Sequence, residues 1–184
     1  MPLPVSDVER ELTHTRRVRF EGYKRADGLW DIEGHLTDVK NHDYDLKSGV
    51  RRAGQPVHDM WIRLTIDTHM NIVDAVAASD AVPYPEGCET IAPAYRQLVG
   101  LNLKQGFRSQ ARELVGKTRG CTHLTEMLGY FPTAAIQAFA GERREERPDG
   151  RKPFQIDQCH ALESSSATVR RWYPKWYRKP DGAA

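Results

Sequence analysis

Alternation of apolar and polar positions marks the first half of the chain. Residues 16–25 place valine, phenylalanine and glycine on one side and mostly charged side chains on the other, with the period of a half-buried β-strand. Asp27-Gly28 is a hairpin-turn signal, and residues 29–38 alternate in the same way. Residues 60–67 and 72–79 repeat this arrangement around a short polar turn. The pattern predicts an antiparallel sheet of about four strands in two hairpins.

Helical signals follow the strands. Short helices are expected over residues 91–99 and 107–115, and a long helix is expected over residues 122–140. Pro132 lies inside the long helix and should kink it or split it in two. Strands followed by helices are typical of an α+β fold, so we expect the helices to pack on one face of the sheet.

Composition divides the chain into four segments. Residues 1–15 are polar with early prolines and should form a flexible arm, and residues 16–140 should form a single α+β domain. Residues 141–153 are charged and contain glycine and proline, which predicts a linker. Residues 154–184 contain a dense group of aromatic side chains. We expect this segment to dock on the domain or on a partner subunit, in which case the protein is a homo-oligomer.

Charge and hydropathy are typical of a soluble globular protein. The 184 residues are 39% hydrophobic and 28% charged, with a formal net charge of +2, which argues against nucleic acid as a partner. No apolar run has the length of a membrane span, and residues 1–15 lack the apolar core of a signal peptide. We therefore expect a cytoplasmic protein that does not enter a membrane. The three cysteines lack CxxC spacing, which favours free, liganding or reactive thiols over disulfides.

A thiol and an imidazole stand together where a loop becomes a helix. Cys121 and His123 lie two residues apart, after a glycine and before an apolar helical repeat. The positive potential of a helix start favours a thiolate, which suits metal ligation or nucleophilic chemistry. His58 and Asp59 begin the third strand, and Cys88 follows the fourth. We expect these side chains to converge at one rim of the sheet and to bind zinc or iron. On spacing alone, buried structural cysteines explain the pattern equally well.

The polar side of the first hairpin carries a second candidate set. Asp31, Glu33 and His35 alternate along its return strand and suggest acid–base catalysis on a small anionic substrate held by arginines of the first strand. Cross-strand ion pairing on a solvated face explains the same residues, and the alternation favours that explanation. A third hypothesis is an assembly module whose aromatic C-terminal segment binds a partner.

Three stretches of the chain resemble a bacterial family known only as a domain of unknown function. They are residues 22–38, with the run DGLWDIEGHLTD, then His58-Asp59-Met60, and Gly120-Cys121-Thr122-His123-Leu124. The resemblance covers nearly the whole chain after the arm, and it implies no activity.

A more remote resemblance, from His58 to Ala140, is to iron–sulfur scaffold proteins of the NifU/IscU type. It implies that Asp59 corresponds to the scaffold's aspartate, Cys88 to its second cysteine, and Cys121 with His123 to its histidine–cysteine pair. An iron–sulfur cluster would then be the cofactor. His58 stands where the scaffold pattern has a cysteine, and the first hairpin and the aromatic tail have no counterpart in that pattern.

Overall fold

The computed structural model describes residues 3–140 and 150–179, which belong to two compact units. The first unit spans Met1–Ala138 and the second spans Phe139–Ala184. The first unit begins with the strands β1 (His14–Lys24), β2 (Trp30–Lys40), β3 (Tyr44–Leu46), β4 (Gly49–Arg51), β5 (Pro56–Ile66) and β6 (Ile72–Ala81). The helices follow, as the 3-10 helix η1 (Glu89–Leu98), α1 (Phe107–Val115), the 3-10 helix η2 (Lys117–Arg119), α2 (Thr122–Leu128) and α3 (Phe131–Ala138).

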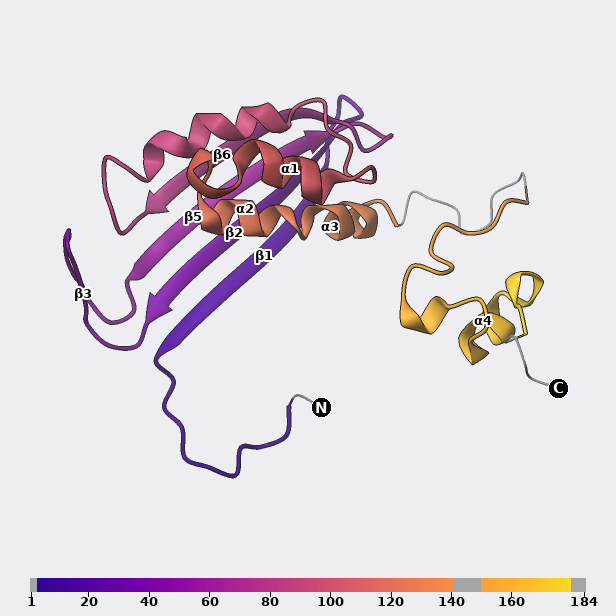
Figure 1. The fold of residues 1–184 in the computed structure, drawn as a ribbon, viewed down its shortest axis with the longest axis horizontal. Helices are drawn as coiled ribbons and strands as arrows, with labels where there is room; N and C mark the ends of the chain where they lie inside the picture. Colours follow the sequence, from indigo (N-terminus) through magenta and orange to yellow (C-terminus); the bar gives the residue numbers. More distant parts are fainter. Residues whose placement is uncertain (1–2, 141–149, 180–184) are drawn as a thin grey trace. The chain divides into compact units, whose positions relative to one another are not determined.

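Four long antiparallel strands form the sheet, in the order β1-β2-β5-β6. Figure 1 shows them side by side, with α1, α2 and α3 lying across them. The predicted α+β fold with an antiparallel four-stranded sheet is confirmed. The segment between the two long hairpins contains the small separate hairpin β3–β4.

The predicted long helix is two helices. α2 ends at Leu128 and α3 begins at Phe131, so the split that Pro132 led us to expect is confirmed. Pro132 lies in the first turn of α3. The N–H groups of a first turn have no intrahelical acceptor, so a proline there costs the helix no hydrogen bond. α1 has the predicted bounds, whereas the helix expected over residues 91–99 is of the 3-10 type and contains Pro93.

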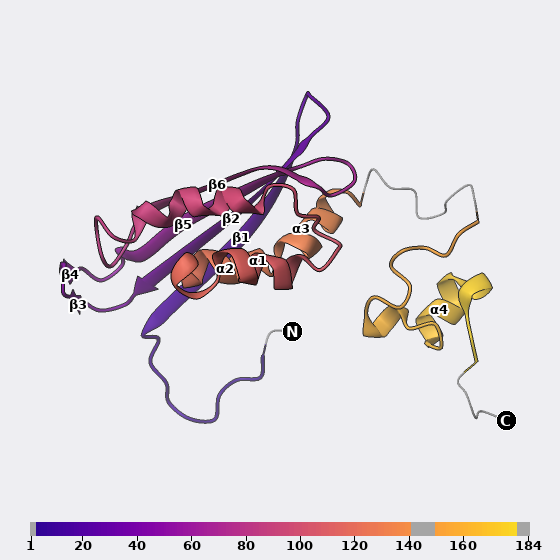
Figure 2. The ribbon, with the colours of Figure 1, turned by 45° about the horizontal axis from the view of Figure 1, so that its top comes forward.

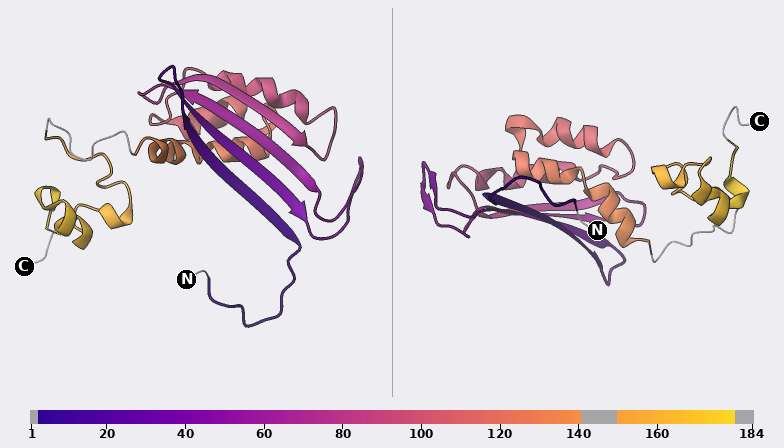
Figure 3. Two further views of the ribbon diagram at one scale, coloured as in Figure 1. Left: turned by 180° about the vertical axis from the view of Figure 1, so that it is seen from behind. Right: turned by 90° about the horizontal axis from the view of Figure 1, so that it is seen from below.

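The helices of the first unit lie on one face of its sheet and leave its other face, the bare face, without a helix of that unit, as Figures 2 and 3 show. On the covered face most even positions of β2 and β5 are buried, among them Ile32, Leu36, Ile62 and Leu64. The regular alternation of β6 is broken at its first residues. Ile72 is buried and Val73 is exposed, because the pairing register shifts between Thr65 and Ile66. Such a slip moves side chains to the opposite face.

A glycine allows α3 to lie close to the middle of β2. A Cβ atom at Gly34 would stand 2.8 Å from Phe20 Cε1 and 3.3 Å from the ring of Phe131. The two phenylalanine rings meet edge to face, with centroids 5.1 Å apart, a favourable aromatic geometry. Glycine inside a strand weakens it locally, and here it admits this aromatic contact.

The second unit contains the 3-10 helix η3 (His160–Leu162), α4 (Ala167–Trp172) and the 3-10 helix η4 (Pro174–Trp176). The Asp157 carboxylate accepts hydrogen bonds from Lys152 and from the backbone and hydroxyl of Ser164. These bonds, led by that of Lys152, lower the pKa of Asp157 to about 2. Most of the predicted linker, residues 141–149, lies outside the described residues, and docking of the aromatic segment stays a prediction.

Candidate metal centre

Three polar residues form one row across neighbouring strands at one end of the sheet. Arg16 of β1 pairs with Asp38 of β2, and Asp38 pairs with His58 of β5. The next row of the same face consists of Val18, Leu36 and Met60, so the polar row lies on the helix-covered face. The register of β2 with β5 shifts directly after Asp38. Irregularities of this kind are common beside functional sites, because they redirect side chains.

Asp38 is the buried centre of this row, with 5% of its surface exposed. Its carboxylate accepts 2.8 Å hydrogen bonds from both Nε and Nη2 of Arg16. It also lies 2.8 Å from His14 Nε2 and 3.0 Å from His58 Nδ1. Burial alone would raise the pKa of Asp38, but the hydrogen bonds of Arg16 and His14 outweigh it and hold the pKa well below its usual range. The carboxylate is therefore ionised.

α2 brings a third imidazole to the same carboxylate, in addition to those of His14 and His58. His123 Nε2 lies 3.9 Å from Asp38 Oδ2, and the His123 and His58 rings have centroids 4.0 Å apart. Asp38, His58 and His123 each offer one ligand atom, and these three atoms lie within 4.8 Å of one another. In the part of the chain that the structure describes, no other group of three or more such side chains has this geometry.

The start of α2 is fixed by the buried Tyr95 of η1. The Tyr95 hydroxyl accepts a 2.9 Å hydrogen bond from the Cys121 N–H and donates a 3.0 Å bond to the Cys121 carbonyl. Thr125, one turn later, donates to the Val115 carbonyl at 2.7 Å. A Cβ atom at Gly120 would stand 1.9 Å from the same carbonyl oxygen, so this close approach requires glycine. These contacts determine where α2 presents its histidine.

Both histidines of the centre are less basic than a free imidazole. Burial lowers the pKa of His58, the nearby His123 lowers it further, and attraction to Asp38 opposes the shift. The pKa of His123 is lowered by burial and then by the positive charge of Arg16, against the attraction of Asp38 and Glu126. At neutral pH both rings are neutral, which is the form that donates an electron pair to a metal.

The five residues predicted as metal ligands do not all meet. His58 and His123 come together, but their carboxylate partner is Asp38. Cys121 Sγ lies 3.9 Å from His123 Nδ1, whereas the other ring nitrogen, Nε2, faces Asp38. Asp59 projects to the other face of the sheet and bonds to His35 at 2.7 Å. Cys88 directly precedes η1. The ligand group found among the described residues contains none of the predicted ligands Asp59, Cys88 and Cys121.

Asp38, His14 and Arg16 were missed by the sequence reasoning, although a signal for them exists. Asp38 has the same parity as the apolar residues of β2, and His58 has the same parity as those of β5. A charged side chain in the inward phase of a strand must find buried partners. Following the inward-facing positions to the end of each strand would therefore have identified Asp38 and His58 as neighbours.

The candidate acid–base residues lie on the bare face of the sheet, in separate pairs. His35 stacks on Trp61 with ring centroids 3.7 Å apart and bonds to Asp59. Asp31 accepts a 2.6 Å hydrogen bond from Thr65 and a longer one from Arg25. Glu33 forms an ion pair of 3.5 Å with a β5 arginine. The structure does not bring Asp31, Glu33 and His35 to one point.

Fold and site together define a class: an α+β protein whose helix-covered sheet face carries a buried carboxylate approached by three imidazoles. Residues 14–137 match the family described as "protein of unknown function (DUF2889)", and the chain belongs to that family. No curated protein and no solved structure gives a significant match to the chain. Among the helices that the structure describes, none has the length and apolar character needed to cross a membrane.

Proposed function

We propose that this protein binds one divalent metal ion, zinc or iron, through Asp38, His58 and His123. The geometry of the three ligand atoms carries the proposal. Ligands of a tetrahedral zinc ion at about 2.0–2.1 Å stand about 3.3 Å from one another. The Asp38 Oδ2 atom is 3.0 Å from His58 Nδ1 and 3.9 Å from His123 Nε2. The two histidine nitrogens lie within 4.8 Å of each other, so side-chain shifts of about an ångström or less would admit the ion.

The ligand types and their surroundings suit this role. One carboxylate and two imidazoles are a donor set of zinc sites and of iron(II) sites, and three protein ligands leave a position for water or substrate. The bonds of Arg16 and His14 to Asp38 would fix the ligating carboxylate, as outer partners of metal ligands commonly do. Cys121, beside His123 Nδ1, would orient the second imidazole.

A single ion fits these residues better than an iron–sulfur cluster. Clusters are held mainly by cysteine thiolates, and the ligand group found among the described residues contains no thiol. The scaffold role suggested by the remote resemblance would need Cys88 and Cys121 as ligands. The acid–base role of Asp31, Glu33 and His35 stays a separate prediction, and the separate contacts of the three residues do not favour it.

Metal analysis of untagged protein tests the proposal. We expect zinc or iron near one equivalent per chain. In competition with a chelator, we expect affinity to fall at least about 100-fold in Asp38→Asn, His58→Gln and His123→Gln. His35→Gln is the matched control, because His35 also bonds to a carboxylate but lies on the bare face. Cys88→Ser should also keep the metal.

Two results would reject the proposal. One is protein that contains no metal, takes up none from added zinc or iron, and folds equally well in chelator. The other is a loss of metal in His35→Gln as large as in His58→Gln, which would place the site on the bare face of the sheet.

A further inference from the structure

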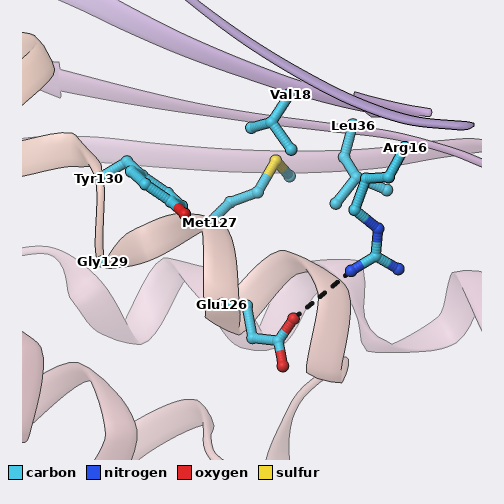
Figure 4. Close-up of a pocket in the computed structure, with 7 residues that line it drawn as sticks. All are labelled: Arg16, Val18, Leu36, Glu126, Met127, Gly129 and Tyr130. Carbon is cyan, nitrogen blue, oxygen red and sulfur yellow. Dashed lines mark ion pairs between the residues drawn. The ribbon is translucent and has the colours of Figure 1, made fainter. Parts of the chain in front are cut away.

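A groove lies beside the candidate metal centre, between the sheet edge and α2. It has a volume of about 380 Å³, within the range of small-molecule pockets, about 300–1,000 Å³. Its walls are apolar: Val18 and Leu36 come from the sheet, and Met127 and Tyr130 from α2 and the turn after it. Val18 has the inward phase of β1 but is 41% exposed. Figure 4 shows the Met127 side chain directed toward Val18.

One end of the groove is polar, because Arg16 and Glu126 line it. Arg16 uses Nε and Nη2 to bind Asp38, and its Nη1 lies 3.7 Å from a Glu126 oxygen, the contact dashed in Figure 4. This separation exceeds hydrogen-bonding distance. The Glu126 side chain is 62% exposed, and ion pairs of such exposed groups contribute little. The Nη1 donors are therefore open to a stronger acceptor.

The two charges at this end differ in mobility. Two hydrogen bonds to the buried Asp38 hold the guanidinium in place, whereas the exposed Glu126 can turn toward solvent. The positive charge of Arg16 is thus fixed, whereas the negative charge of Glu126 can move away from the groove. A ligand that enters the groove meets a permanent positive group at the end of an apolar trough.

We propose that this groove binds a small monocarboxylate with an apolar aliphatic or aromatic body. The carboxylate takes the place of Glu126 on Arg16 Nη1, and the body packs against Val18, Met127 and Tyr130. Guanidinium–carboxylate bonds are among the stronger and more directional contacts in proteins. The groove shares Arg16 with the candidate metal centre, but acid binding does not require the metal, so the two proposals can fail separately.

The methionines allow both sites to be observed at once by methyl NMR. Met127 lines the groove, Met60 Sδ lies 3.9 Å from Cys121 Sγ near the metal ligands, and Met70 is buried near the β5–β6 turn. Octanoate should shift the Met127 signal and leave Met70 unchanged. Octanol and octylamine, which keep the chain but lack the negative charge, should bind at least about tenfold more weakly. Zinc should shift Met60.

Substitutions around the groove sharpen the test. Glu126→Gln removes the competing carboxylate and should tighten octanoate binding several-fold, whereas Glu113→Gln on the exposed face of α1 makes the same charge change elsewhere and should not. Val18→Trp should fill the groove, abolish the Met127 response and leave the zinc response of Met60 intact. Arg16→Lys keeps a charge without the fork and should weaken binding.

The outcomes separate this inference from the proposed function. Octanol or octylamine binding as tightly as octanoate, or Glu126→Gln binding it more weakly, overturns the monocarboxylate site. If octanoate does not shift the Met127 signal while zinc shifts that of Met60, acid binding in the groove is rejected and the metal site is not. A Met127 response to octanoate with no zinc response anywhere rejects the metal ion and leaves the groove standing.

Discussion

Replacing Asp38 by asparagine should destabilise the metal-free protein strongly. The substitution keeps the size of the side chain but removes its charge and one of its acceptor oxygens. Asp38 accepts from Arg16 at two points and also bonds to His14 and His58. An asparagine amide would direct its own N–H donors at a guanidinium or an imidazole, so at least part of this network loses its acceptor.

The size of the effect follows from these contacts. A hydrogen bond to a charged group contributes about 1.5–3 kcal/mol, and removing one member of a buried ion pair destabilises by about 3–5 kcal/mol. The side chains of Arg16 and His14 are 37% and 36% exposed, so water can replace part of what they lose. We therefore expect the free energy of unfolding to fall by about 2–4 kcal/mol.

Urea unfolding in the presence of chelator measures this loss without a contribution from metal. The midpoint should fall by about 1–2 M urea, with an unchanged slope. Asp59→Asn is the control, because Asp59 makes one hydrogen bond to His35 and its side chain is 26% exposed, so its loss should stay below about 1 kcal/mol. Equal midpoints for the two variants would refute the argument that the buried carboxylate organises this end of the sheet.

Two further predictions concern the surroundings of Asp38. Gly120→Ala should push the start of α2 away from the Val115 carbonyl. We expect it to destabilise the protein by about 1–3 kcal/mol and to weaken zinc binding. Gly129→Ala is the control, because its Cβ would meet only Glu126 O at 3.4 Å, and it should change neither stability nor zinc binding. The metal-free protein should also lose stability as the pH falls from about 7.5 to about 5.5. The folded pKa values of His58 and His123 lie below the ordinary value of 6.5, so the unfolded chain binds more protons in that window. Urea midpoints measured in chelator should fall less with falling pH in a variant with both His58 and His123 replaced by glutamine. An unchanged pH dependence in that variant would show that these two histidines do not cause the loss.

The fold was largely predictable because its main signals are local. Alternation identifies each long strand from its own residues, and the order of strands and helices indicates the α+β class. The departures depend on pairing. The exposure of Val73 follows from a register shift against β5, and no property of β6 alone shows that shift. The hairpin β3–β4 has only three residues in each strand, too few for periodicity to stand out.

The candidate site was predicted only in part because residues at strand ends were grouped by chemical type and not by phase. His58 and Asp59 are neighbours in the sequence, yet successive residues of a strand face opposite sides. His58 therefore meets Asp38 under the helices, while Asp59 meets His35 on the bare face. The pair Cys121 and His123 does lie together, but the ring presents its other nitrogen to the carboxylate.

The position of the polar row is itself an argument for function. An apolar row of similar volume at this end of the covered face would be neutral or stabilising, because buried charges lose hydration that their partners seldom restore in full. Stability alone therefore gives no reason to place Arg16, Asp38 and His58 in one line. Arg16 supplies the positive charge that faces the carboxylate, whereas the His58 and His123 imidazoles are neutral at neutral pH, because burial lowers their pKa values. A carboxylate held ionised beside two neutral imidazoles is an arrangement that a divalent cation would complete, and the groove that shares Arg16 supplies a place for a ligand next to it.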